Sequence, residues 1–192
     1  VHPLRSITSP PKDTLEAWDR LSLERRVVGI GGIDAHAHKV NLFGFFEVEV
    51  FPYKVLFKSI RTHILTNVRL DPSSDTDSFL SAKKALYSSL REGNCFFTNY
   101  YHGDAKGFRF FAEDGNSIYQ MGQSLDLKEK VKLRVVLPNL SATIRLIHNG
   151  RLINSVDSAD AEFVVKEKGA YRIEVYQNEN AWIFSNHIRI GL

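Results

Sequence analysis

The chain has 192 residues, 43% of them hydrophobic and 24% charged, and a formal net charge of +3 at pH 7. Such a composition is typical of a folded globular protein with one large domain or two small ones. It lacks an apolar run near the roughly 18–20 residues that span a bilayer, and its basic residues alternate with acidic ones, which argues against a nucleic-acid partner. We expect a soluble protein, cytoplasmic or exported, without a membrane or nucleic-acid partner.

The first residue is Val, and the only methionine is Met121. We therefore expect a processed chain or a fragment of a longer protein. The single cysteine, Cys95, excludes an internal disulfide. It lies in the apolar segment CFFT, so we expect it to pack as a small hydrophobic residue rather than to act as a nucleophile.

The first part of the chain alternates helical and strand patterns. A helix is predicted within 9–26, with Asp13 as the cap and Trp18 on the buried face. The apolar run at 27–30 predicts a short strand buried on both faces, as in a parallel sheet. This order of helix, strand and polar turn is typical of an α/β unit, in which the turn after a strand carries the site.

Three further segments precede the middle of the chain. The aromatic stretch 40–53 is expected to cover a sheet or line a cleft, and 53–65 is predicted to be a helix. A clearer helix is predicted at 75–93, capped by Asp75 or Thr76 and ended by a glycine. A strand is expected to follow it.

From about residue 109 onward, apolar and polar residues alternate in short runs. Asn149 and Gly150 separate two such runs and predict a hairpin with a type I′ turn. About seven short strands favour a β-sandwich, in which Tyr171 is expected to be the tyrosine-corner residue.

The segment GGIDAHAH, residues 31–38, carries the chemistry of interest. Asp34, His36 and His38 are good ligands for zinc, manganese or iron. In an extended chain, residues two apart lie on the same side, so the three side chains could converge on a metal that activates water. The alternative is that they are ordinary hydrogen-bonding residues of a turn. One segment also rarely supplies a complete catalytic site, which needs at least three protein ligands.

Two families place such residues after a strand. IDAHAH resembles the first barrel strand of amidohydrolases, but the later strands of that barrel do not fit this chain. GIDAHA, followed by FPYKVLFKSIRTHIL, LREGNCFFTN and GDAKGFRFFAEDG, resembles the C-terminal part of polymerase-and-histidinol-phosphatase (PHP) metal-dependent phosphoesterases. That family has GSDAHA at this point, so Ile33 replaces the usual serine. The resemblance covers nearly the whole chain.

The resemblance implies an α+β fold, with the C-terminal remnant of a PHP-type α/β barrel at 1–104 and an immunoglobulin-like β-sandwich at 105–192. It implies Asp34 and His36 as metal ligands for a divalent zinc, manganese or iron ion. His38 matches no ligand of the family, and no catalytic residue is assigned. The family's first HxH motif and its middle ligands are missing, so the metal would be incompletely coordinated.

The function expected from this resemblance is that of the C-terminal part of a metal-dependent hydrolase of small phosphoesters, inactive by itself. Association of copies through an exposed barrel edge is also expected. The alternative is a non-catalytic module whose β-sandwich contacts a partner or a glycan. Among the other histidines, His63 and His102 are the two that could reach a cleft, and packing is the competing interpretation for His63.

Overall fold

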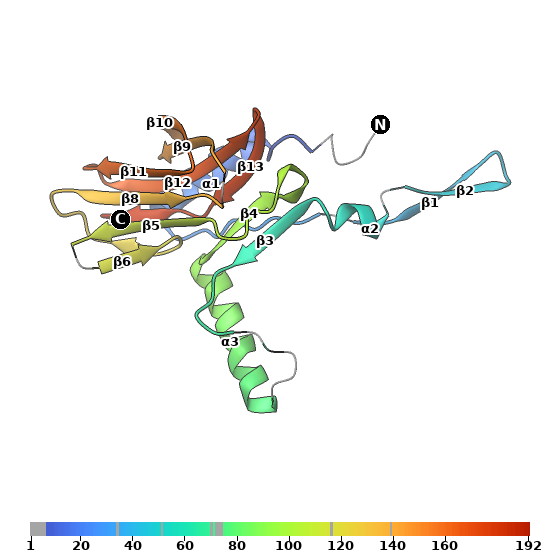
Figure 1. Cartoon of the computed structure of the whole chain (residues 1–192), viewed down its shortest axis with the longest axis horizontal. Helices are drawn as coiled ribbons and strands as arrows, with labels where there is room; N and C mark the ends of the chain where they lie inside the picture. The colour runs from blue at the N-terminus through green and yellow to red at the C-terminus, as the bar shows by residue number, and fades with distance from the viewer. Residues whose placement is uncertain are drawn as a thin grey trace.

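The computed structural model describes residues 7–33, 35–50, 52–69, 71, 75–115, 117–138 and 140–192, without the side chain of residue 42. Two β-sheets packed face to face form the main body (Figure 1). The described helices are α1 (Lys12–Glu24), α2 (Tyr53–Leu56), α3 (Thr76–Glu92) and a single 3-10 turn, η2 (Tyr100–His102). The described strands are β1 (His38–Leu42), β2 (Phe46–Val50), β3 (Ile60–Ile64), β4 (Cys95–Asn99), β5 (Arg109–Asp114), β6 (Ser117–Gln120), β7 (Ser124–Leu125), β8 (Val131–Val136), β9 (Ala142–His148), β10 (Arg151–Ser158), β11 (Asp160–Val165), β12 (Gly169–Gln177), β13 (Asn180–Ser185) and β14 (Ile188–Ile190).

Within the described residues, the larger sheet has eight strands. Its main path runs β10-β9-β12-β13-β4-β3, and β14 and β7 continue from β12. These pairings are antiparallel except that between β14 and β7. The smaller sheet runs β11-β8-β5-β6 and is antiparallel throughout. The larger sheet is continuous across position 105, because β3 and β4 extend the sheet that the C-terminal strands build.

The hydrophobic core lies between these two sheets. On β8, Val131, Leu133 and Val135 are buried, and on β12, Ile173 and Val175 face the same core. The alternation of apolar and polar residues in the second part of the chain therefore predicted a β-sandwich correctly. The hairpin between β9 and β10 is confirmed as well, with φ angles of 51° and 81° at its two turn residues.

The expected α+β fold with a PHP-type α/β barrel remnant at 1–104 is wrong, because this chain is built mostly of antiparallel strands. Residues 27–30 belong to no strand. β3 and β4 pair with each other in antiparallel fashion, and β4 pairs with β13 across a long stretch of sequence. The backbone groups of this part are therefore satisfied by the sandwich sheet, where a barrel would need parallel strands joined by helices.

Two of the three predicted helices are confirmed, and the third is much shorter than predicted. α3 is confirmed with both ends: the Asp75 carboxylate accepts hydrogen bonds from the backbone N–H groups of Asp77 and Ser78, and Gly93 closes the helix at φ 77°. α1 is confirmed, with Trp18 buried, but it follows Pro11 and has no side-chain cap, so the Asp13 cap is wrong. The helix predicted over 53–65 is wrong beyond Leu56, where the chain turns into β3.

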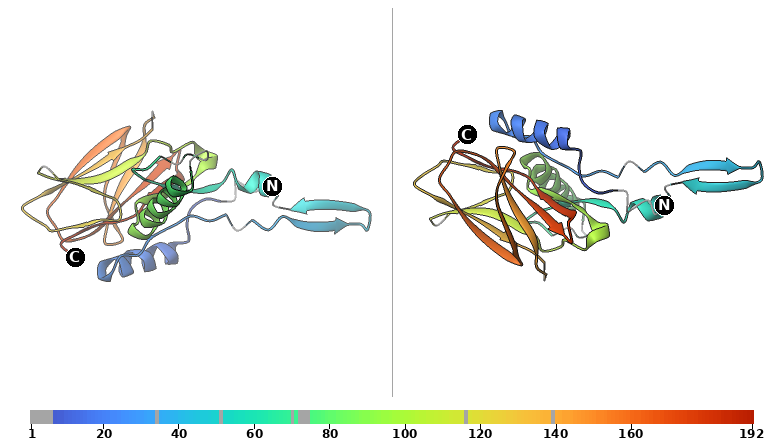
Figure 2. Two further views of the ribbon diagram at one scale, coloured as in Figure 1. Left: turned by 90° about the horizontal axis from the view of Figure 1, so that it is seen from below. Right: turned by 90° about the horizontal axis from the view of Figure 1, so that it is seen from above.

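The segment expected to cover a sheet instead forms the hairpin β1–β2, which projects from the body in each view (Figures 1 and 2). α3 projects in another direction, and within its described side chains only Ala82 and Ser89 are buried. α1 lies against the outer face of the larger sheet, over β12. These arrangements leave two open regions, one beside α1 and one beside α3.

Candidate functional site

The chain that leads into GGIDAHAH is fixed against the larger sheet. The Gly29 N–H donates to Oδ1 of Asn186 at 2.7 Å, and Nδ2 of Asn186 donates back to the Gly29 carbonyl at 3.0 Å. Two residues later, the Gly31 N–H donates to Oγ1 of Thr62 at 2.9 Å, and this hydroxyl donates to the Gly31 carbonyl at 3.0 Å. The segment thus runs over β4 and β3 without joining the sheet.

Close packing explains two of its glycines. A Cβ atom at Gly29 would overlap the Trp18 indole, and one at Gly31 would overlap Ile60 and Phe97. Only glycine lets the backbone approach the sheet this closely. Packing against the sheet therefore fixes the backbone at Gly29 and Gly31, just before the motif.

Of the two predicted metal ligands, Asp34 lies outside the described residues and His36 is exposed. The His36 imidazole is stacked on that of His38, with ring centroids 5.2 Å apart and planes inclined by 15°. The two rings lie side by side, although Ala37 between them has a φ of 49° and the backbone there is not extended. No group of three His, Cys, Asp or Glu side chains with metal-binding geometry occurs in the described part of the chain. The assignment of Asp34 and His36 as ligands stays a prediction.

His63 both packs against a neighbouring ring and lines a cavity, which are the two roles considered for it. Its ring stacks on Phe96 at 4.7 Å between centroids, and it lines a polar cavity of about 870 Å³ with Asn94, Lys106 and Arg109. Burial lowers the pKa of His63 below its ordinary value, although the Asp104 carboxylate opposes this. His63 is therefore a neutral packing residue at the wall of a polar cavity.

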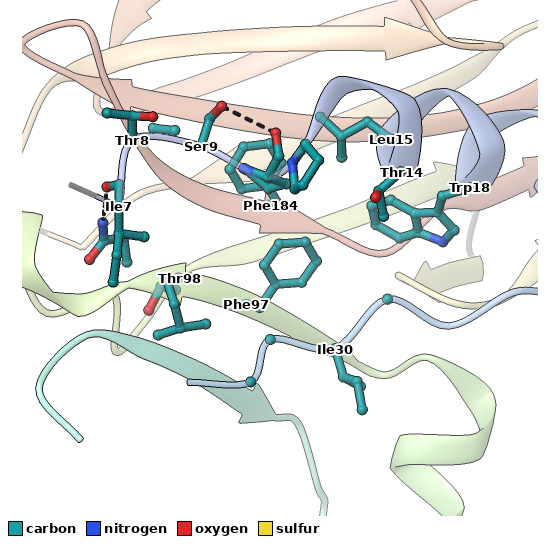
Figure 3. Close-up of a pocket in the computed structure, with 18 of the residues that line it drawn as sticks. Ile7, Thr8, Ser9, Thr14, Leu15, Trp18, Ile30, Phe97, Thr98 and Phe184 are labelled. Carbon is teal, nitrogen blue, oxygen red and sulfur yellow. Dashed lines mark hydrogen bonds between the residues drawn. The ribbon is translucent and has the colours of Figure 1, made fainter. Parts of the chain in front are cut away.

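A second opening, the apolar groove, has a volume of about 540 Å³ and lies between α1, the segment 27–32 and the outer face of β4 and β13. None of the described residues that line it is charged. Figure 3 shows the side chains of Trp18, Phe97 and Phe184 gathered around it, and the two phenyl rings stack with centroids 5.3 Å apart. The groove is suited to apolar side chains.

A buried network of charged residues joins α1 to β12 and the β13–β14 connection. The Arg172 guanidinium donates to both carboxylate oxygens of Asp19, at 2.6 and 2.8 Å, and to Glu174 at 2.6 Å. His187 contacts Asp19 through Nε2 at 2.7 Å. Burial acts to raise the pKa of Asp19, but the hydrogen bonds from Arg172 and His187 outweigh it and lower the pKa.

This network contains a Ser-His-Asp array that the sequence did not suggest. Because a carboxylate only accepts, Nε2 of His187 carries the proton given to Asp19, and Nδ1 accepts from the Ser22 hydroxyl at 3.2 Å. Ser22 is only 1% exposed, and the adjacent cavity of about 10 Å³ could hold at most one water. Without room for a substrate, the array holds α1 in place.

Cys95 is confirmed as a buried packing residue. It has no exposed surface, and burial raises the pKa of its thiol to about 11, against a hydrogen bond from Asn186. A thiol with such a pKa is almost fully protonated near neutral pH and is a poor nucleophile.

No protein-family model, curated protein or solved structure matches the chain. Among the described residues, no helix is both long and apolar enough to cross a membrane.

Proposed function

We propose that this chain supplies part of the metal site of a metal-dependent phosphoester hydrolase, with Asp34 and His36 as two of the ligands of a divalent ion. The remaining ligands would come from residues outside this sequence. The proposal rests on the motif GIDAHA and on the resemblance of its surroundings to metal-dependent phosphoesterases. The metal would lower the pKa of a bound water and stabilise charge on the phosphoryl oxygens.

The observation that carries the proposal is the exposed imidazole of His36, which stacks on His38 and follows a backbone bonded to the sheet as far as Gly31. The paired hydrogen bonds at Gly29 and Gly31 fix the approach to the motif. Catalytic metal sites need ligands on such preorganised supports, because a ligand that must be ordered on binding weakens metal affinity.

Zinc titration of the chain by calorimetry tests the proposal. We expect weak binding of one ion near neutral pH, since two ligands cannot close a zinc site. His36→Ala and Asp34→Ala should each abolish this binding, whereas His38→Ala should weaken it less. His148→Ala is the matched control, because His148 packs on Tyr171 in the sandwich.

Two results would count against the proposal. One is zinc affinity that is the same in the wild-type chain and in both ligand variants. The other is the complete absence of zinc binding at millimolar concentration. Turnover of p-nitrophenyl phosphate by the isolated chain, if lost in Asp34→Ala, would support the ligand assignment but would show that the site is more complete than proposed.

The apolar groove favours a second function, that of a binding module that receives apolar side chains from a protein partner. It supports this alternative because its lining is uncharged and open to solvent. The two functions differ in their response to metal: a groove-binding module would bind its partner equally well in zinc and in EDTA.

A further inference from the structure

The hairpin β1–β2 (residues 38–50), called the arm, is amphipathic. Val40 and Val48 are directly paired, and Phe46 lies on the same face. Lys39, Asn41, Glu47 and Glu49 lie on the other face, where Lys39 and Glu47 form an ion pair of 2.7 Å. One face of the arm is therefore apolar except for His38 at its base, and the other is charged.

In the described part of the chain, the apolar face of the arm is largely exposed to solvent. Val40, Phe46 and Val48 are 41%, 61% and 43% exposed, and at the turn Phe43 and Phe45 are 86% and 76% exposed. Phe43 also has a φ of 59°, which is unfavourable for a bulky residue. A lone two-stranded hairpin is marginally stable in water, so burying this apolar face against a partner would stabilise the arm.

We propose that two copies of the chain exchange arms, with the apolar face of each arm seated in the apolar groove of the other copy. The arm projects away from the body (Figures 1 and 2). The groove of its own chain is lined by residues of α1. The proposal is independent of the metal-site function, since it uses neither Asp34 nor His36.

The apolar face of the arm and the groove are suited to each other, because neither places a charge in the contact. The described residues that line the groove are uncharged, so they accept the apolar face without leaving a buried charge unpaired. The charged face of the arm, with one lysine and two glutamates, stays in solvent. Its excess of negative charge does not suit an anionic membrane surface, which attracts basic segments.

Two-fold symmetry adds to the stability of the exchanged dimer. In a two-fold dimer, each copy gives one arm and receives one, so every arm–groove contact is formed twice. Each five-residue strand spans roughly 17 Å and presents its apolar side chains in one row along this length. Stable dimers bury about 800 Å² per partner, and in the exchanged dimer both arm–groove contacts contribute to this buried area.

Sedimentation equilibrium of the whole chain tests the proposal. We expect a dimer whose dissociation constant rises at least about tenfold in Val48→Glu and in Thr14→Glu. The first places a charge on the apolar face of the arm and the second places one in the groove; both positions are exposed, so folding is not at risk. Asn41→Lys, opposite Glu47 on the charged face, and Asp13→Ala beside the groove should leave the constant unchanged.

Cross-linking between different variants identifies the contact itself. Thr14→Cys and Val48→Cys chains, mixed and treated with a short bis-maleimide, should give a heterodimer that neither variant gives alone. Cys95 does not interfere, because it is fully buried. Asn41→Cys mixed with Thr14→Cys is the matched control and should cross-link much less.

Three results would overturn the arm exchange. One is a monomer up to the solubility limit. Another is a dimer unaffected by Val48→Glu, as expected if the open edge of β3 pairs instead. The last is efficient cross-linking of Val48→Cys with itself, which would show that the arms pack on each other.

Discussion

Asp19 on α1 and Arg172 on β12 are 153 positions apart and are joined by two buried hydrogen bonds, from Nε at 2.6 Å and from Nη2 at 2.8 Å. Arg172 also lies over the Trp18 ring, and His187 approaches the same ring edge-on at 4.6 Å between centroids. α1 is thus attached to the sheet by a polar network beside an aromatic contact. The attachment predicts how the chain responds to mutation and to pH.

Replacing Asp19 with alanine should destabilise the fold by about 3 kcal/mol, because it leaves the buried Arg172 charge without its main partner. Urea unfolding followed by circular dichroism would measure this. Glu16→Ala is the control on the same helix: its ion pair with Lys12 is exposed to solvent and should contribute little. Equal unfolding midpoints for Asp19→Ala and the wild type would contradict the structural role of the network.

Stability should fall as the pH drops below about 6.5. Burial lowers the pKa of His187 from its ordinary 6.5, although Asp19 opposes this, and burial lowers the pKa of His63 and His102 in the same direction. The unfolded chain then binds more protons than the folded chain once the pH falls below 6.5, so protons favour unfolding. The contribution of these histidines to the free energy of unfolding is fully present above pH 6.5 and is lost as the pH falls toward their pKa values in the folded state.

Urea midpoints measured across this pH range would show the loss. His187→Gln should have a lower stability at neutral pH but a shallower dependence on pH, because one of the three titrating groups is gone. A midpoint that rises on acidification would show that the histidines gain protons on folding, which is opposite to the effect expected from their burial.

The tyrosine corner predicted at Tyr171 is confirmed: its buried hydroxyl donates to the Glu167 carbonyl at 2.7 Å. Tyr171→Phe removes this hydrogen bond with little change in shape and should cost about 1 kcal/mol. Thermal unfolding would detect it. Tyr87→Phe on the exposed face of α3 is the control and should leave the melting temperature unchanged.

Gly122 is a position where any side chain should destabilise the fold. Its φ is 89°, and a Cβ atom would overlap the Glu92 carbonyl and the backbone of Gly93. Gly122→Ala should therefore cost at least about 2 kcal/mol. Gly32→Ala is the matched control, since no atom lies within 4 Å of its added methyl group. Chemical denaturation of the two variants should separate them clearly.

Local signals in the sequence were reliable where the structure they specify is local. Asp75 and Gly93 mark the ends of α3, and Asn149–Gly150 marks a hairpin, because capping and turn chemistry act within a few residues. The alternation along β8 also indicated a strand of a β-sandwich, since period two places every second side chain on one face.

Long-range pairing explains the errors. The run at 27–30 is as apolar as a strand, but the backbone of Gly29 bonds to the side chain of Asn186, and that of the following Gly31 bonds to Thr62, rather than to a neighbouring strand. The pairing of β4 with β13 could not be predicted from either segment alone. The Asp19 network was also hidden, because a charged residue on a helix is usually exposed.

The two ends of the chain depend on each other, and this has a consequence for synthesis. α1 and β4 need partners on β12, β13 and the residues that follow, so during synthesis they remain without these partners until those strands have been made. Until then, the edge of β4 and the indole of Trp18 are uncovered and open to aggregation. We expect chains truncated before β13 to be recovered mainly with chaperones or in inclusion bodies.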